Sequence, residues 1–296
     1  MKHLVVIVGP TAVGKTAAAI EAAQKMGTEI LSCDSRQFYQ ELNIGVARPS
    51  PEELAAARHH FIASRPVTSP YNVYDYEQDA LAVLNNIFKT RDVAVAVGGS
   101  GLYVDALCRG INQMPDPTPE LRAELSGKIA DGKLNELLAE LKLLDPEYYA
   151  VVDRNNPIRV QRALETIHTS GQKYSLLISK ELPKHPFKIT KIALSCERDE
   201  LRERIYSRVD RMIAEGLVDE VRSLTDFRHL NTLNTVGYKE IFEYLYGGKT
   251  LDQAVAEIKN HTWQYAKKQM TWLRRYNDIQ WVDRKNFKDF LQVFPS

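Results

Sequence analysis

Short, continuous apolar runs recur along the chain, separated by longer stretches with helical periodicity. Such runs predict strands of a parallel sheet that is buried on both faces, because these strands need no alternation of polar and apolar side chains. The helical stretches between them then serve as crossover connections. We therefore predict an α/β fold, a parallel sheet flanked by helices, with strands at residues 4–8, 30–33, 93–97, 189–196 and 279–282.

The middle of the chain has a different pattern. Two proline-rich stretches, 114–119 and 182–186, bound a segment with helical periodicity and no strand pattern. Within it, Asn156 and Pro157 predict the start of a helix and Gly171 its end. We predict a helical insertion domain at residues 114–185, with residues 1–113 and 186–296 forming the α/β core and its C-terminal helices.

Two long helices are predicted after the fourth strand, at about 199–224 and 251–276. In the first, Arg204, Arg208 and Arg211 form a stripe beside the apolar face. This stripe is either a solvated basic surface or a contact to a phosphate. The second helix ends in basic and aromatic residues, a mixture that suits an RNA backbone and is also compatible with an amphipathic helix packed by its aromatic side chains.

Composition narrows the class of protein. The 296 residues are 44% hydrophobic and 26% charged with a net charge of +1, so any RNA-binding surface must be a local patch. The three cysteines, Cys33, Cys108 and Cys196, lack the spacing of a zinc site or a disulfide framework. With no leader pattern and no apolar run near 18 residues, we expect a cytoplasmic protein with no membrane contact.

A phosphate-binding loop of the form G-x-x-x-x-G-K-[ST] joins the first strand to the following helix. Such a loop points backbone N–H groups and a helix N-terminus at one anion. Lys15 adds a positive charge, and the Thr16 hydroxyl can ligate Mg²⁺. The sequence predicts a di- or triphosphate site at Gly9, Pro10, Thr11, Ala12, Val13, Gly14, Lys15 and Thr16.

Two further candidates follow other strands. Asp34 ends the second strand, and Ser100 lies in the glycine-rich turn after the third. Because the carboxyl ends of parallel strands meet at one edge, we expect both to share a cleft with the phosphate loop. Asp34 is a Mg²⁺ ligand (directly or through water), a general base or a turn-capping residue, and Ser100 can stabilise a developing anion. The residues alone predict a Mg²⁺-dependent, phosphate-binding transferase.

Several motifs follow one another along the chain: the phosphate loop 9–16, then 34–39, 43–49, 98–103, 159–165, 236–239 and 266–274. In this order they make the chain resemble the tRNA dimethylallyltransferases of bacteria, the tRNA isopentenyltransferase family, from residue 4 to 275. This resemblance implies a P-loop NTPase-like fold and transfer of a dimethylallyl group from dimethylallyl diphosphate to N6 of adenosine 37 of tRNA, with release of pyrophosphate.

The resemblance also implies roles for residues. Asp34 would take the proton from N6, while Lys15, Mg²⁺ near Thr16, Ser100 and Arg208 would neutralise the pyrophosphate. The insertion domain would grip the tRNA anticodon stem-loop. The implied tRNA contacts are Asp34, Ser35, Arg36, Gln37, Ile158, Arg159, Val160, Gln161, Arg162, Gly237, Tyr238, Lys239, Lys267, Lys268 and Arg274.

Four positions depart from the family pattern, which commonly has Thr at Val46 and Ser100 and Arg at Trp263 and Lys268. Three alternatives also remain. An adenylate isopentenyltransferase would act on free AMP, ADP or ATP, but needs no helical insertion to grip RNA. A P-loop small-molecule kinase does not explain the motifs after residue 98, and a non-catalytic RNA-binding protein does not explain an intact site. We expect a monomer.

Overall fold

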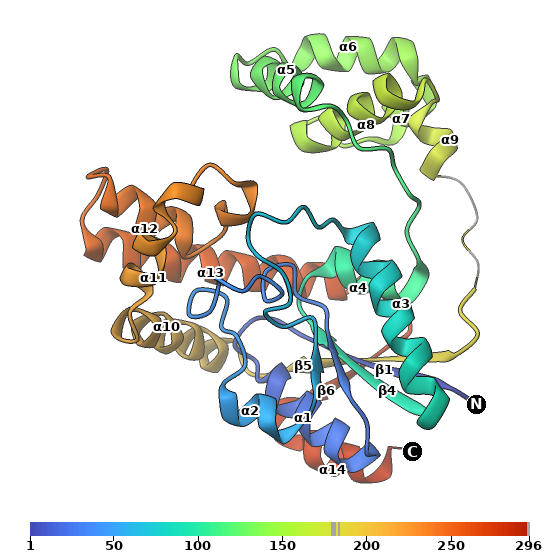
Figure 1. The fold of residues 1–296 in the computed structure, drawn as a ribbon, viewed down its shortest axis with the longest axis vertical. Helices are drawn as coiled ribbons and strands as arrows, with labels where there is room; N and C mark the ends of the chain where they lie inside the picture. The colour runs from blue at the N-terminus through green and yellow to red at the C-terminus, as the bar shows by residue number, and fades with distance from the viewer. Residues whose placement is uncertain (179–181, 183, 295–296) are drawn as a thin grey trace. The chain divides into compact units, whose positions relative to one another are not determined.

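The computed structural model describes residues 1–178, 182 and 184–294, so that Pro183 of the second proline-rich stretch lies outside the described residues. Six strands form one parallel sheet in the order β3-β2-β4-β1-β5-β6, which confirms the predicted α/β class (Figure 1). The strands are β1 (His3–Val8), β2 (Ile30–Ser32), β3 (His59–His60), β4 (Val93–Gly98), β5 (Lys188–Ser195) and β6 (Ile279–Asp283).

All five predicted strands form, and β3 is an addition. It has two half-buried residues at the sheet edge and is too short to leave an apolar run in the sequence.

The sheet belongs to a compact core unit made of residues 1–109 and 185–296. The helices and 3-10 turns of this core unit are α1 (Lys15–Met26), α2 (Pro51–Ala56), α3 (Val73–Thr90), α4 (Gly101–Arg109), α10 (Arg198–Ala214), α11 (Leu217–Ser223), η1 (Thr225–Phe227), η2 (Asn231–Leu233), α12 (Tyr238–Leu245), α13 (Leu251–Leu273), η3 (Arg284–Asn286) and α14 (Phe287–Val293).

Helices cover both faces of the sheet, as its apolar strands require. Along β1, Val5 and Ile7 pack with residues of α1 and α14, whereas Leu4, Val6 and Val8 pack with residues of α3 and α4. The alternation follows from the two-residue period of a strand. The continuous apolar run therefore reflects burial on two faces.

The helix predicted at 199–224 is two helices. Gly216 lies between α10 and α11 with φ of +100°, a left-handed conformation that glycine adopts without strain. The break lets Val209 of α10 and Leu217 of α11 pack into one apolar cluster with residues of α12 and α13. The last helix, α13, ends at Leu273, three residues before the predicted end.

Residues Gly110–Lys184 form a second compact unit. Its core is built mainly from helical residues, with the fully buried Leu137, Leu141 and Leu164 among its members. Asn156 caps α8 and Gly171 ends it, as predicted. The helices are α5 (Pro119–Ala130), α6 (Leu134–Leu144), α7 (Pro146–Val151), α8 (Pro157–Ser170) and α9 (Tyr174–Ile178).

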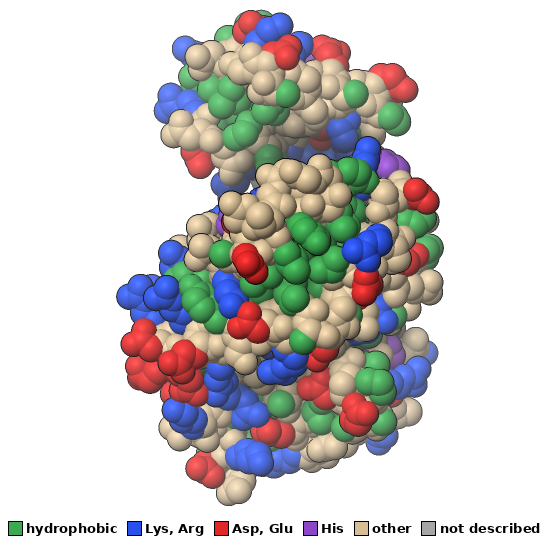
Figure 2. Space-filling model, turned by 90° about the vertical axis from the view of Figure 1, so that its left-hand side faces the viewer, with side chains coloured by type: hydrophobic (Ala, Val, Ile, Leu, Met, Phe, Trp, Pro, Cys, Tyr) green, Lys and Arg blue, Asp and Glu red, His purple; other side chains and the backbone are tan. Residues whose placement is uncertain are grey.

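Charges of both signs are interspersed over the surface shown in Figure 2, around an area of apolar side chains. This mixture agrees with the net charge of +1 and excludes a single-sign field over this face. Among the described residues, no helix is both long enough and apolar enough to cross a membrane.

Candidate active site

The phosphate loop connects β1 to α1 and forms one wall of a cavity. Gly14 has φ of +97° and brings the loop into the first turn of α1, which starts at Lys15. A left-handed φ favours glycine at this position. Thr11, Lys15 and Thr16 line the cavity, which has a volume of about 540 Å³. The N-terminus of α1 thus lies at a space large enough for a diphosphate.

Lys15 lies within this cavity wall, and among the described residues no carboxylate lies within ion-pair distance of it. Its Nζ donates hydrogen bonds to the carbonyl oxygens of Gly9 at 3.1 Å and Pro10 at 2.9 Å. Burial, and secondly the positive charge of Arg208, lower the pKa of Lys15 to about 7. A buried ammonium group that is paired only with carbonyls is well prepared to bind an anion.

Asp34 follows β2 and lines the same cavity. Its Oδ1 accepts hydrogen bonds from the backbone N–H groups of Arg36 at 2.9 Å and Gln37 at 3.3 Å, so the turn-capping interpretation is confirmed. Its Oδ2 has no hydrogen-bond partner among the described residues. Burial raises the pKa of Asp34, against the opposing effect of these N–H groups and of Lys15. One oxygen is held and the other is available for a proton.

Ser100 lies in the turn between β4 and α4. Its Oγ accepts a hydrogen bond from Ser35 N at 3.0 Å and donates one to Ser35 Oγ at 3.2 Å. A side chain at Gly98 would lie 2.3 Å from the Cys33 carbonyl oxygen, so the β4 turn can approach the β2 turn this closely only with glycine there. Ser100 therefore fixes the turn that carries Asp34.

The arginine stripe of α10 lies against the phosphate loop. Arg208 NH1 donates to Thr11 Oγ1 at 3.3 Å, and Arg204 NH1 donates to the Val13 carbonyl oxygen at 3.3 Å. Arg208 and Arg211 both line the 540 Å³ cavity. Two residues of the stripe thus face the cavity and the third contacts the loop, while their contact with a phosphate stays a prediction.

A second cavity of about 200 Å³ shares Thr11, Asp34, Val46, Ala47, Arg208 and Met212 with the first. Its lining contains both polar and apolar side chains. Such a lining suits an adenine base and a short hydrocarbon chain. The polar members are Thr11, Ser35, Arg36, Ser100, Thr235, Thr262 and Tyr265, and the apolar ones are Val46, Val209, Met212, Val236 and Ile258.

The predicted RNA-binding residues of the core unit separate into several groups. Ser35, Arg36 and Gly237 line the second cavity, while Gln37 lines the first and donates to the carbonyl oxygens of Val46 and Ala47. The fully buried Tyr238 instead donates its hydroxyl to Glu220, at 2.5 Å. Its inclusion among direct RNA contacts is therefore corrected, because it has no surface to offer.

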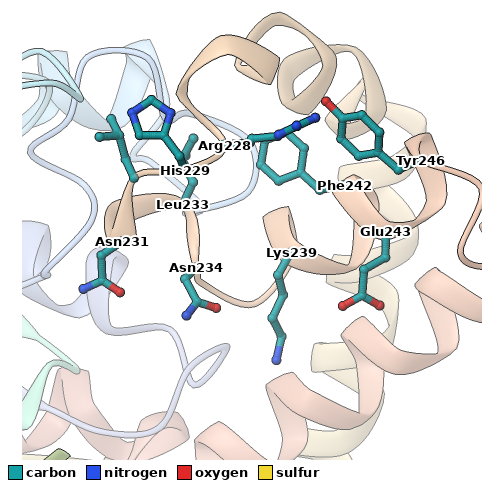
Figure 3. Close-up of a pocket in the computed structure, with 10 residues that line it drawn as sticks. Arg228, His229, Asn231, Leu233, Asn234, Lys239, Phe242, Glu243 and Tyr246 are labelled. Atoms are coloured by element: carbon teal, nitrogen blue, oxygen red, sulfur yellow. The ribbon is translucent and has the colours of Figure 1, made fainter. Parts of the chain in front are cut away.

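Lys239, at the start of α12, lines an open groove with Asn231, Asn234 and Glu243 (Figure 3). These four side chains extend in the same direction, and Arg228 stacks over the Tyr246 ring at 4.5 Å on the other side. Amide, ammonium and aromatic groups in one open groove suit contact with a nucleotide.

The predicted residues of the helical unit follow its α8. Ile158 and Arg159 are exposed, Gln161 donates to Ser126 Oγ at 2.8 Å, and Arg162 lies 3.8 Å from Glu165. Val160 is fully buried in the core of this unit. It is therefore corrected from an RNA contact to a packing residue.

The C-terminal part of α13 is basic on its exposed side. Lys267 and Arg274 line a pocket of about 480 Å³ together with Arg198 and Trp263, and no carboxylate lines it. Arg198 lies over the Trp263 ring at 5.9 Å. Lys268 lines a neighbouring pocket with Lys267. The positive charges that an RNA backbone would need are therefore confined to a local patch, as expected for a chain with a net charge of +1.

Sequence reasoning missed Gln269, Tyr265 and Glu220. Glu220 accepts hydrogen bonds from the backbone N–H groups of Ile44 at 2.7 Å and Gly45 at 3.1 Å, and thereby holds a loop that lines both cavities. Gln269 is buried between Ala266 and Leu273 on the apolar face of α13. A polar residue at an apolar helical position was the available signal.

The oxygen donors in the first cavity fit a Mg²⁺ ion that arrives with a diphosphate. The Thr16 hydroxyl and the Asp34 carboxylate line the same space. Among the described residues there is no cluster of three metal-binding side chains. Mg²⁺ commonly takes one carboxylate and otherwise phosphate oxygens and water.

Comparisons with known proteins agree on one family. A family model described as IPP transferase matches residues 37–276. The chain is 44% identical over 292 residues to tRNA dimethylallyltransferase 1 of Bacteroides thetaiotaomicron, covering 99% of this chain and 95% of that protein. It is 45% identical over 295 residues to the enzyme of the same name from Bacteroides fragilis, covering 100% of this chain and 98% of that protein.

Solved structures give the same result. The tRNA isopentenylpyrophosphate transferase of Bacillus halodurans aligns with a TM-score of 0.72 at 33% identity, over 99% of this chain and 95% of that chain. A eukaryotic dimethylallyltransferase acting on tRNA aligns with a TM-score of 0.79 at 25% identity, over 96% of this chain and 74% of that chain. Both alignments cover the core unit and the helical unit of this chain.

Proposed function

Because the chain belongs to the IPP transferase family, we propose that the cavities described above carry out the reaction of a tRNA dimethylallyltransferase. The acceptor is N6 of adenosine 37 in tRNA, and the donor is dimethylallyl diphosphate. The observation that carries this proposal is the position of Asp34, which lines both the phosphate cavity and the cavity beside it. A base at that junction can reach an amine that attacks the donor.

The diphosphate binds to groups that line the first cavity. The N-terminus of α1, Lys15 and Arg208 supply positive charge there. Thr16, with Asp34 through a water molecule, would hold Mg²⁺, which supplies further charge neutralisation at the departing pyrophosphate when it is bound. These residues stabilise the leaving group more strongly as its negative charge grows.

The transfer then needs one proton acceptor. N6 attacks the first carbon of the dimethylallyl group, the carbon–oxygen bond breaks, and pyrophosphate leaves with the electron pair. Asp34 Oδ2, the oxygen without a protein partner among the described residues, takes the proton from N6. The adenosine must leave its base stack to enter the second cavity.

We propose that three surfaces of the protein bind the tRNA. Exposed Ile158 and Arg159 with Arg162 lie on α8 of the helical unit, Lys239 lies in the groove of Figure 3, and the basic residues of α13 line their own pockets. A monomeric state and a cytoplasmic location complete the proposal. Buried, free Cys33 and Cys108 agree with a reducing compartment.

A label-transfer assay tests the function. Purified protein with Mg²⁺ and radiolabelled dimethylallyl diphosphate is offered unmodified tRNA or AMP, with Asp34→Ala as the control variant. We expect label in tRNA alone, lost in the variant. Label in AMP alone would establish a nucleotide isopentenyltransferase, and label in neither would contradict the transferase.

A further inference from the structure

Gln269 connects two of the three loops that form the candidate active site. Its Oε1 accepts a hydrogen bond from Thr11 N in the phosphate loop at 2.8 Å. Its Nε2 donates to the Gly99 carbonyl oxygen, in the turn after β4, at 2.9 Å. The residue is 6% exposed, so both hydrogen bonds form away from water. Buried amides in such a position are costly unless both ends are paired, and here both are.

The connection continues on both sides of Gln269. Thr11 accepts a hydrogen bond from Arg208 at its Oγ1, while the turn of Gly99 continues into Ser100, which is bonded to Ser35 beside Asp34. One chain of hydrogen bonds and short backbone links therefore runs from the diphosphate side to the base. Gln269 is the only direct side-chain link that the described residues make between the phosphate loop and the turn after β4.

The fit around Gln269 is tight. A Cβ atom on Gly99 would lie 2.2 Å from Gln269 Nε2, closer than any real contact. The amide thus occupies the space that the absent side chain leaves. This explains a glycine whose backbone φ is not in the left-handed region.

We propose that Gln269 is a positioning residue for prenyl transfer, an inference that rests on the proposed function. It fixes the distance between two parts of the site. One is the phosphate loop, which holds the leaving group, and the other is the Ser100 turn, which is hydrogen-bonded to Ser35 beside the base Asp34. Transfer requires the amine, the allylic carbon and the leaving oxygen to be in line, and errors of about 1 Å cost up to about a hundredfold in rate. The proposed tRNA-binding surfaces, on α8, α12 and the exposed side of α13, do not include Gln269 and should be unaffected.

Gln269→Met removes both hydrogen bonds at similar volume, and Gln269→Glu keeps the acceptor for Thr11 N while losing the donor to Gly99. We expect Gln269→Met to lower kcat by about 10- to 100-fold and the KM for tRNA to stay within about threefold. Gln269→Glu should lose more pyrophosphate affinity than Gln269→Met, because its carboxylate beside the phosphate loop repels the anion. Gln292→Met, at an exposed helical position of α14 outside the site, is the matched control.

Gly99→Ala perturbs the same contact from the opposite side. If both act through one hydrogen bond, the double variant Gly99→Ala/Gln269→Met should lose little more activity than either single variant. Gly127→Ala, where an added Cβ meets nothing within 4 Å, is its control. Additive losses would overturn the proposal, as would an unchanged kcat in a folded Gln269→Met protein.

Binding of inorganic pyrophosphate, measured by calorimetry, gives a readout that needs no turnover. We expect its affinity to fall in Gln269→Met, and equal affinity in both proteins would overturn the proposal. If the wild-type protein failed to transfer label, the proposed function would fail while this binding test would still decide the role of Gln269. Should Gln269→Met not fold, Gly99→Ala and Gln269→Glu supply the same two measurements.

Discussion

Lys15 should take up a proton when dimethylallyl diphosphate binds. In the free protein its pKa is lowered to about 7, chiefly by burial. A diphosphate placed against the ammonium group favours its charged form and raises the pKa again. Binding is therefore coupled to protonation at any pH between the free and bound pKa values.

The size of the effect follows from the free-state pKa. With a pKa of about 7 the amine is about 90% neutral at pH 8, so binding takes up roughly 0.9 proton there and roughly 0.1 proton at pH 6. Affinity for the diphosphate should then fall by about tenfold for each pH unit above 7. Below pH 6 this contribution is constant, because Lys15 is already charged.

Isothermal titration calorimetry in buffers of different ionisation enthalpy measures the proton uptake directly. Dimethylallyl diphosphate is titrated into the wild type and into Lys15→Met at pH 6 and pH 8, without tRNA so that no transfer occurs. The variant reports the protonation of the diphosphate itself, and the difference belongs to Lys15. Equal uptake by both proteins at pH 8 would refute the assignment of a lowered pKa to Lys15.

Three further changes test other parts of the site. Asp34→Asn should lower kcat by about 10²- to 10⁴-fold with tRNA affinity in filter binding within a few-fold, and an equal loss of affinity would contradict the base role. Arg208→Ala should lower kcat/KM for the donor by about 100-fold in a steady-state assay, with exposed Arg202→Ala as control. Arg159→Ala and Arg162→Ala should each raise the KM for tRNA and reduce its salt slope by about 1, and an unchanged slope would exclude phosphate contact.

The elements that the sequence predicts well are those with a strong local signal. The apolar strands can be recognised in the sequence because a strand such as β1 is buried on both faces, and the phosphate loop because Gly14 has to adopt a left-handed φ. The two-residue β3 leaves no such signal. The break at Gly216 was marked by a glycine, but a single glycine within a helical pattern does not decide between a tolerated residue and a turn.

For the site, the sheet topology predicts which turns lie side by side, but the sequence does not predict where their side chains point. Asp34 and Ser100 could be placed at one edge because the carboxyl ends of parallel strands converge. The hydrogen bonds of Gln269 reach residues 258 and 170 positions away, and no local pattern specifies them. The resemblance to a family predicted Val160 and Tyr238 as RNA contacts, but a shared motif does not say that a side chain points inward.

The order of the strands has a consequence for synthesis on the ribosome. β1 lies between β4 and β5, but Gly110–Lys184 is translated between these two partners. At about 5–20 residues per second the nascent sheet keeps one edge of β1 open for several seconds. Thr11 of the phosphate loop is translated 258 residues before Gln269, which ties the loop to its neighbour. The diphosphate pocket is thus assembled only after residue 269 has been translated, and a chain terminated before that point carries the loop without the residue that holds it.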